Sequence, residues 1–293
     1  MKLLLSPLVT LFCLATILIS LHYCNAVNLP NNETVPALIV FGDSIVDSGN
    51  NNYIKTGFKC NFLPYGQDFG GGNQPTGRFS NGLVLSDIIA SKFGVKKLLP
   101  AYLDPNLQLQ DLLTGVSFAS GDQLNMFKEY KNKIKEEVGE ERMKMIISKS
   151  VYIICIGSND IANTYAQTPY RRFNYDIPSY TDLLASYSSN FLQELYGLGA
   201  RRIGVIDTKL VYLDSYHPLM YLVQNPAKYG FDVADRGCCG TGDLEVSIFC
   251  NQYSSSICSN SSRYIFWDSY HPTQEAYNLL CSMVIDDKIK DFF

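Results

Sequence analysis

Short apolar runs rich in β-branched residues alternate along this chain with longer stretches of helical periodicity, and this alternation constrains the fold most. It is typical of a parallel sheet covered by helices, because parallel neighbours need a crossover that is usually helical. Apolar residues make up 46% of the chain, which is enough for a substantial buried core. We expect strands at residues 37–41, 115–119, 151–156, 202–206 and 210–213, and helices at residues 83–93, 181–198 and 273–290.

The beginning of the chain has the features of a secretion signal. A lysine near the start is followed by an uncharged apolar run, and small residues near position 26 suit a signal peptidase. An uncleaved membrane anchor is the alternative, because the run nearly reaches spanning length. We expect residues 1–26 to be removed and residues 27–293 to form one secreted, extracellular domain with no transmembrane segment. Sequons at Asn32 and Asn260 predict a glycoprotein.

Seven cysteines follow the expected cleavage point. Four of them lie inside a Gly/Ser/Thr-rich stretch of 21 positions. In an oxidising compartment this clustering predicts a loop pinned by disulfides, with the pairing left open. Zinc binding is the alternative, but two of the four are adjacent and lack the C-x-x-C spacing of zinc sites. Cys155 and Cys281 lie in apolar segments and are expected to be buried thiols. The disulfide candidates are Cys238, Cys239, Cys250 and Cys258.

Composition excludes several classes of function. The formal net charge is −4 and no long basic block occurs, so we expect no binding to nucleic acid. The chain has three histidines, and His22 lies in the expected signal. A histidine-rich metal site is therefore excluded, and histidine-dependent chemistry has only His217 and His271 as candidates. We expect neither a metal nor a cofactor.

A candidate nucleophile follows the first predicted strand. Residues 37–41 run directly into Gly42-Asp43-Ser44. In a parallel sheet the ligand site lies at the carboxyl ends of the strands, where Ser44 emerges. Gly42 allows a sharp backbone turn, and the residues after it can begin a helix whose N-terminus favours a developing anion. The alternative is an ordinary loop serine.

A serine nucleophile needs a neighbouring imidazole to accept its proton, and the imidazole needs a carboxylate to hold its tautomer. Both candidate histidines occur in the same pentapeptide, Asp-Ser-Tyr-His-Pro, at residues 214–218 and 268–272. Spacing alone does not choose between them. Context favours His271 as the base, because Pro272 would open the last predicted helix and fix the loop that carries the histidine.

Several blocks of the sequence together resemble the plant GDSL esterase/lipase family within the SGNH hydrolase superfamily, and most closely its extracellular lipase group. They span nearly the whole mature chain in the family's order, and as a set they are highly specific. The blocks are Phe41-Gly42-Asp43-Ser44, Thr76-Gly77-Arg78-Phe79-Ser80-Asn81-Gly82, Gly115-Val116-Ser117-Phe118-Ala119-Ser120-Gly121, Gly157-Ser158-Asn159-Asp160 and Trp267-Asp268-Ser269-Tyr270-His271-Pro272.

The resemblance implies a fold, an activity and a set of site residues. The fold would be a three-layer α/β/α arrangement around a mostly parallel sheet of about five strands. Ser44 would be the nucleophile, His271 the base and Asp268 its orienting carboxylate. The backbone N–H of Ser44, with Gly121 and Asn159, would form the oxyanion hole, where neutral donors stabilise a tetrahedral oxyanion.

The chain departs from the family pattern at two places. Gly121 runs directly into Asp122 and Gln123, where family members continue with further glycines. The predicted strands 202–206 and 210–213 are separated by only three residues, whereas parallel neighbours need a crossover of about a dozen. We therefore expect the sheet to be incomplete at its fifth strand. Segment 210–213 is expected to be broken or to lie elsewhere, not parallel to its predecessor.

The leading functional prediction is a secreted, monomeric serine esterase or lipase that acts on small acyl esters or lipids. Removal of acetyl groups from cell-wall polysaccharide is an enzymatic alternative, since the same residues could perform it. A different class of function is also open. The chain could be a catalytically weak family member that binds lipid or a protein partner.

Overall fold

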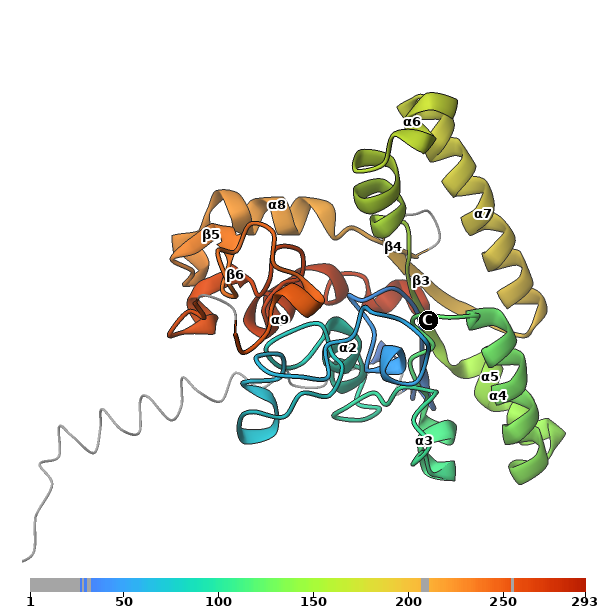
Figure 1. Ribbon diagram of the computed structural model, residues 1–293. Coiled ribbons are helices and arrows are strands. Elements are labelled where there is room, and N and C mark those ends of the chain that lie inside the picture. The colour runs from blue at the N-terminus through green and yellow to red at the C-terminus, as the bar shows by residue number, and fades with distance from the viewer. Residues whose placement is uncertain (1–26, 28, 31–32, 207–210, 254–255) are drawn as a thin grey trace, which may run out of the picture.

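The computed structural model describes residues 27, 29, 30, 33–206, 211–253 and 256–293 (Figure 1). The expected signal, Asn32 and the connection before segment 210–213 lie outside the described residues. The main sheet has four strands, all parallel, in the order β1-β2-β3-β4. A second sheet pairs β5 with β6, also in parallel. The strands are β1 (Leu38–Gly42), β2 (Val151–Cys155), β3 (Arg202–Ile206), β4 (Val211–Leu213), β5 (Val233–Gly237) and β6 (Tyr264–Phe266).

The helices confirm the expected alternation. Each of the three predicted helices is present with somewhat shifted ends, and the Lys/Glu-rich stretch between the first two strands forms a pair of helices. The helices are α2 (Leu85–Lys92), α3 (Leu109–Thr114), α4 (Gln123–Val138), α5 (Glu140–Lys149), α6 (Pro169–Asn174), α7 (Ile177–Gly197), α8 (Tyr216–Gln224) and α9 (Gln274–Ile285), with a π-helix at Asp160–Ala166.

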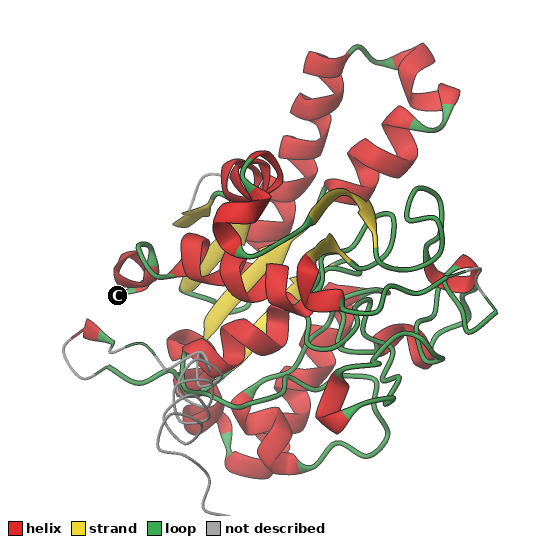
Figure 2. Ribbon diagram, turned by 90° about the vertical axis from the view of Figure 1, so that its left-hand side faces the viewer, coloured by secondary structure: helices red, strands yellow, loops and turns green. Residues whose placement is uncertain are grey.

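The sheet separates two apolar cores, so the expected three layers are confirmed. Alternate residues of β1 point to opposite faces, as the period of two in a strand requires. Leu38 and Val40 pack with side chains of α2 and α9, whereas Ile39 and Phe41 pack with α4, α5 and the end of α7. Figure 2 shows the strands enclosed between helices on both sides. All five residues of β1 are buried, which places its carboxyl end inside the molecule.

One predicted strand is reduced to isolated bridges. Segment 115–119 runs beside β1, where the Phe118 N–H donates to the Val40 carbonyl (2.7 Å) and the Val40 N–H donates to the Val116 carbonyl (3.2 Å). The Ser120 N–H continues the contact by donating to the Gly42 carbonyl (3.1 Å), and Ser117 also pairs with Ala101 on its other side. The main sheet therefore has four regular strands, and this segment extends it at the outer edge of β1.

The expectation for segment 210–213 was wrong. Val211–Leu213 forms β4 and lies parallel to β3, with Val211 opposite Gly204 and Leu213 opposite Ile206. This register removes the need for a long crossover. From the end of β3 to Val211 the chain moves back about two residues and across one strand, roughly 8 Å from a ~3.3 Å rise and a ~4.8 Å strand spacing. A connection of a few residues spans that distance. The strand is short, with three residues against five in β3.

The cysteine-rich loop is pinned by two disulfides beside the small sheet. Cys238 pairs with Cys258, and Cys239 pairs with Cys250. This confirms the disulfide prediction over the zinc alternative and settles the pairing that the sequence left open. Cys155 and Cys281 are buried outside these disulfides, as is Cys60.

The π-helix, α6 and the first turns of α7 form an arm that projects away from the sheet (Figure 1). Pro169 lies at the start of α6 and Pro178 at the start of α7, where a missing N–H removes no helical hydrogen bond. Asp176 caps α7 through the Ser179 N–H (2.9 Å). Within the described ranges, no helix is long and apolar enough to cross a membrane.

Candidate active site

The turn after β1 requires a glycine. Gly42 has a φ of +153°, and a Cβ there would lie 2.3 Å from the carbonyl oxygen of Cys155 on the neighbouring strand. Gly42 pairs with Cys155 on β2, and only a glycine allows the two strands to approach this closely. The chain turns here, at the carboxyl end of β1. Ser44 therefore emerges at the sheet edge where the sequence predicts it.

Ser44, His271 and Asp268 are linked by hydrogen bonds. His271 Nε2 lies 2.8 Å from Ser44 Oγ, and His271 Nδ1 lies 2.8 Å from Asp268 Oδ2. Asp268 is fully buried and His271 is 2% exposed. The backbone N–H of His271 also donates to Asp268 Oδ1 (2.7 Å), so one short loop holds both side chains. An imidazole in this arrangement can accept the serine proton while the carboxylate fixes its tautomer.

A tyrosine that the sequence analysis missed supports the carboxylate. The hydroxyl of Tyr65 donates to Asp268 Oδ2 (2.7 Å) and accepts the N–H of Ser247 (2.8 Å). Burial, together with the charge of Asp268, raises the pKa of Tyr65 well above its ordinary value. The phenol therefore stays protonated and donates. No local pattern could have identified it, because Tyr65 and Asp268 are 203 positions apart.

The repeated pentapeptide forms the same histidine–aspartate pair twice. His217 Nδ1 lies 2.7 Å from Asp214 Oδ2, and the backbone N–H of His217 donates to Asp214 Oδ1 (3.1 Å), as in the second copy. The two copies differ in their surroundings. The His217 side chain is 77% exposed on α8, whereas His271 is buried against Ser44. Spacing alone does not distinguish the two histidines. The proline and the predicted helix after His271 favoured it, and His271 is the histidine that contacts Ser44.

The segment that carries Asn159 contacts the nucleophile turn through its neighbour. The hydroxyl of Ser158 donates to Asp43 Oδ2, and Asp43 Oδ1 accepts the N–H of Ile45 (3.1 Å). Burial raises the pKa of Asp43 above its ordinary value. Asn159 directly follows this contact and precedes the π-helix, where its Oδ1 accepts a hydrogen bond from Asn163 (2.9 Å).

Gly121 also lies one residue beyond a contact with the nucleophile turn. The N–H of Ser120 donates to the Gly42 carbonyl (3.1 Å), and Ser120 and Gly121 have φ values of +73° and +79°. Both expected oxyanion donors thus follow residues that touch the turn around Ser44. Their role stays a prediction.

Gln123 is a further residue that the sequence analysis missed. Its Oε1 accepts the N–H of Gly42 (2.8 Å) and its Nε2 donates to the carbonyl of Gly42 (2.9 Å). The side-chain amide therefore pairs with the backbone of β1 as a neighbouring strand would. Gln123 lies at the place where the chain departs from the family pattern, so no motif pointed to it.

The asparagine-rich continuation after Ser44 is structural. Buried Asp47 accepts the backbone N–H groups of Gly49 (2.8 Å) and Asn50 (2.6 Å). The Asn50 side chain donates to the Ser117 carbonyl (2.9 Å) and accepts the Leu103 N–H (3.0 Å). These bonds fasten the loop after the nucleophile to the segment that flanks β1.

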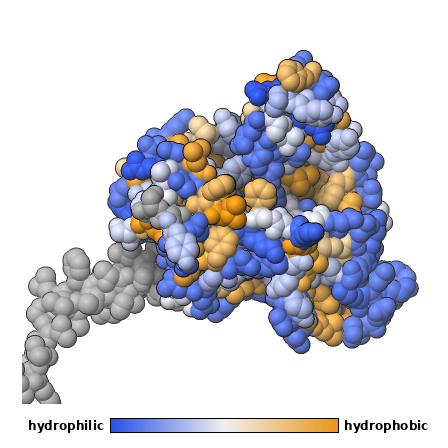
Figure 3. Space-filling view, in the orientation of Figure 1, coloured by the Kyte–Doolittle hydropathy of each residue, from blue (hydrophilic) through white to orange (hydrophobic). Residues whose placement is uncertain are grey.

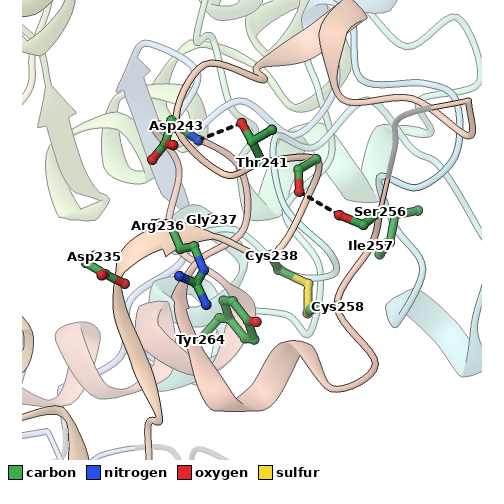
Figure 4. A pocket seen from close by; sticks show the side chains of 11 residues that line it. Asp235, Arg236, Gly237, Cys238, Thr241, Asp243, Ser256, Ile257, Cys258 and Tyr264 are labelled. Atoms are coloured by element: carbon green, nitrogen blue, oxygen red, sulfur yellow. Dashed lines mark hydrogen bonds between the residues drawn. A yellow bond between two sulfur atoms is a disulfide. The ribbon is translucent and has the colours of Figure 1, made fainter.

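Two of the cavities lined by described residues lie next to features already described, the serine and the disulfides. One, of about 560 Å³, begins beside the serine, where Ile45, Ser158 and Tyr270 form part of its wall. The other, of about 640 Å³, lies behind the Cys238–Cys258 disulfide (Figure 4). None of Ser44, His271 and Asp268 lines either cavity, but their chain neighbours Ile45, Tyr270 and Pro272 line the first one.

Comparison with known proteins identifies the family. The family model described as GDSL-like Lipase/Acylhydrolase matches residues 38–283. Two curated proteins of Arabidopsis thaliana are similar over most of the chain. GDSL esterase/lipase EXL3 is 40% identical, with 96% of this chain and 95% of the relative covered. GDSL esterase/lipase At3g43570 is 45% identical, with 92% of this chain and 95% of the relative covered.

The alignment with EXL3 spans 347 positions, whereas this chain has 293 residues, so at least 54 of those positions have no counterpart here. This agrees with the two places where the sequence departs from the family pattern. The names of the curated relatives support a carboxylic-ester hydrolase. The matched range and the identity over nine-tenths of the sequence show that this chain belongs to the GDSL-like lipase/acylhydrolase family.

Proposed function

We propose that the protein hydrolyses carboxylic esters with Ser44 as nucleophile, His271 as general base and Asp268 as the carboxylate that orients the imidazole. One observation carries the proposal. Ser44 Oγ and His271 Nε2 lie 2.8 Å apart, and the other ring nitrogen is held by a buried carboxylate. That distance is within the range over which a base accepts a proton.

In the proposed reaction Ser44 Oγ attacks the ester carbonyl while His271 Nε2 takes its proton. The tetrahedral oxyanion forms near the carboxyl ends of β1 and β2. We assign its stabilisation to the Ser44 and Gly121 backbone N–H groups and the Asn159 side-chain amide. His271 then gives the proton to the departing alcohol, and water, activated by the same imidazole, releases the acid from Ser44. Loss of one such donor typically lowers kcat by about 10²–10³-fold.

The repeated pentapeptide provides a matched control for this proposal. We expect Ser44→Ala and His271→Ala each to abolish most hydrolysis of p-nitrophenyl acetate, because both act in the covalent step. His217→Ala removes the same side chain from the same local sequence and should leave turnover near the wild-type rate. Equal losses from the two histidine variants would contradict the assignment of the base.

Activity should also fall on acidification, because a protonated His271 cannot accept the serine proton. A pH–rate profile of kcat/KM checks this for the wild type and for His217→Ala, which should share one profile. A rate that stays constant down to about pH 4 would argue against a histidine base.

We further propose that the protein is secreted as a monomer of residues 27–293 after removal of residues 1–26. The two disulfides support an oxidising compartment. Asn260 is exposed, and its side chain accepts the N–H (3.1 Å) and hydroxyl (2.7 Å) of Ser262, the hydroxyl residue of its sequon. Mass spectrometry of the secreted protein should find the new N-terminus and glycan at Asn32 or Asn260. Both sequons unmodified in a glycosylating host would count against this compartment.

A further inference from the structure

The carboxylate of Asp268 receives hydrogen bonds from its own loop and from a distant segment. Its Oδ1 accepts the backbone N–H groups of Tyr270 (2.9 Å) and His271 (2.7 Å). His271 Nδ1 lies 3.0 Å from Oδ1 and 2.8 Å from Oδ2, and Oδ2 also accepts the Tyr65 hydroxyl (2.7 Å). The backbone donors belong to the loop that carries the aspartate, so they move with it. Tyr65 lies 203 positions away in the chain and fastens Oδ2 to the body of the protein.

Tyr65 is itself aimed at the carboxylate. A phenol has one hydrogen to donate, and the oxygen of Tyr65 accepts the backbone N–H of Ser247 (2.8 Å). Because an N–H group only donates, this contact leaves the phenolic hydrogen for Asp268. Ser247 lies three residues before Cys250, which is paired with Cys239. The loop pinned by the disulfides therefore holds the phenol in its donating orientation.

The ring of Tyr65 is fixed by aromatic packing and is shielded from substrate. It packs edge-on against Phe62 (5.9 Å between ring centroids), Trp267 (6.2 Å) and Phe79 (6.4 Å). Tyr65 is fully buried and lines neither of the two cavities described above. In Figure 3 apolar side chains gather on the outside, in the hollow between the projecting arm and the rest of the molecule. The buried phenol can therefore act through Asp268 but not on a substrate.

We propose that Tyr65 is a positioning residue for the reaction, whose hydroxyl holds the Asp268 carboxylate toward His271 and withdraws part of its negative charge. The inference rests on the proposed ester hydrolysis. Without this donor the carboxylate is free to turn, and the imidazole points less accurately at Ser44. The carboxylate also keeps more negative charge beside the imidazole, which favours the protonated ring. The hydroxyl thus keeps His271 both aligned and available as a base at lower pH.

Several other ionisable groups lie in this network. The side chains that interact with Asp268, His271 or Tyr65 include Asp43, Cys60, Tyr270 and Tyr277. Burial raises the pKa of the thiol and of both of these tyrosines, so they stay neutral in the assays below. Asp43 interacts electrostatically with His271, and burial raises its pKa too. All four are present in wild type and variant, so a difference between the two proteins reports the loss of the Tyr65 hydroxyl.

Tyr65→Phe removes the hydroxyl and keeps the ring, and Tyr152→Phe is its matched control. Tyr152 is also fully buried, and its hydroxyl donates to the Ile147 carbonyl at the same distance of 2.7 Å. Tyr65→Phe should lower kcat for p-nitrophenyl acetate about tenfold with little change in KM. The ratio of kcat/KM at about pH 5.5 to that at about pH 8 should also fall about threefold, because His271 takes up its proton at higher pH. Tyr152→Phe should change neither quantity, and melting temperatures show that both variants are folded.

NMR of the histidine rings separates this inference from the proposed activity, because it needs no turnover. In Tyr65→Phe the His271 ring should become protonated at higher pH than in wild type. The exposed His217 is the internal reference and should titrate unchanged. A wild-type protein that does not hydrolyse the acetate overturns the proposed activity, and the histidine titration still decides the role of Tyr65. Equal effects of the two tyrosine variants on kcat, an unchanged pH profile, or an unchanged His271 titration overturns the role of Tyr65 alone.

Discussion

A buried ion pair joins Arg78, which precedes helix α2 in the chain, to Asp87 of that helix. Arg78 Nε lies 2.7 Å from Asp87 Oδ2 and Nη2 lies 2.8 Å from Oδ1, a two-pronged contact. Arg78 also donates to the carbonyls of Ser48 (3.1 Å) and Leu99 (3.2 Å). Arg78 is 6% exposed and Asp87 is fully buried. Removal of the arginine therefore leaves a carboxylate in the core without its cation.

Arg78→Met should lower the free energy of unfolding by about 3–5 kcal/mol, because breaking one side of a buried pair leaves an uncompensated charge. The remaining donors to Asp87 are the backbone N–H groups of Val84 (3.1 Å) and Leu99 (3.0 Å). Total stability is typically ~5–15 kcal/mol, so the loss is a large share of it. Urea unfolding followed by circular dichroism measures the change as a shift in midpoint at constant slope.

An exposed ion pair provides the control. Lys144 Nζ lies 3.0 Å from Glu140 Oε1, and both side chains are about half exposed. Lys144→Ala should leave the free energy of unfolding nearly unchanged, because exposed ion pairs contribute little to stability. If Arg78→Met lowers the free energy of unfolding by less than about 1 kcal/mol, the buried ion pair stabilises the fold no more than an exposed one, and the prediction is wrong.

Three further predictions follow from single contacts. Gln123→Ala should lower kcat for p-nitrophenyl acetate about tenfold with little change in KM or fold, since the amide positions Gly42 before the nucleophile; an unchanged kcat would contradict this. Hydrogen bonds from the Thr241 turn lower the pKa of Glu245 from 4.5 to about 2. The stability that this carboxylate contributes is present above pH 4.5 and is lost as the pH falls toward 2. The melting temperature should therefore fall less in Glu245→Gln than in wild type over that range. Parallel plots of melting temperature against pH for the two proteins would contradict this. The Tyr277 hydroxyl is buried and has no hydrogen-bond partner among the described residues. Tyr277→Phe should therefore keep or raise the free energy of unfolding, by up to about 1 kcal/mol in urea titrations, and a clear loss would show that the hydroxyl has a partner.

The sequence predicted the features that depend on local pattern. A β-branched apolar run that ends at Gly42 predicts a buried strand followed by a turn at its carboxyl end, so the position of Ser44 followed directly. The pair formed by Asp268 and His271 is equally local, because a spacing of three residues brings both side chains to one side of a short loop. The long amphipathic segments were also identified, since their apolar faces must be buried.

Contacts between distant segments could not be predicted in the same way. The supports from Tyr65 and Gln123 depend on where separate loops meet, and no spacing in the chain encodes that. The disulfide partners of Cys238 and Cys239 also depend on which parts of the loop meet, and the spacing of the cysteines does not determine this. The expectation for β4 failed because the rule for crossovers assumes strands that begin at the same level, whereas β4 begins beside the middle of β3.

Covalent labelling of Ser44 tests the central claim most directly. A fluorophosphonate probe reacts with a serine only where a base accepts its proton, and the adduct remains on the oxygen that attacks. The purified protein should gain one adduct, mapped by mass spectrometry to the peptide with Ser44. Ser44→Ala should gain none, His271→Ala should react far more slowly, and His217→Ala should react like wild type. Ester hydrolysis that persists with Ser44 unlabelled, or an adduct on another serine, would contradict the assignment of the nucleophile.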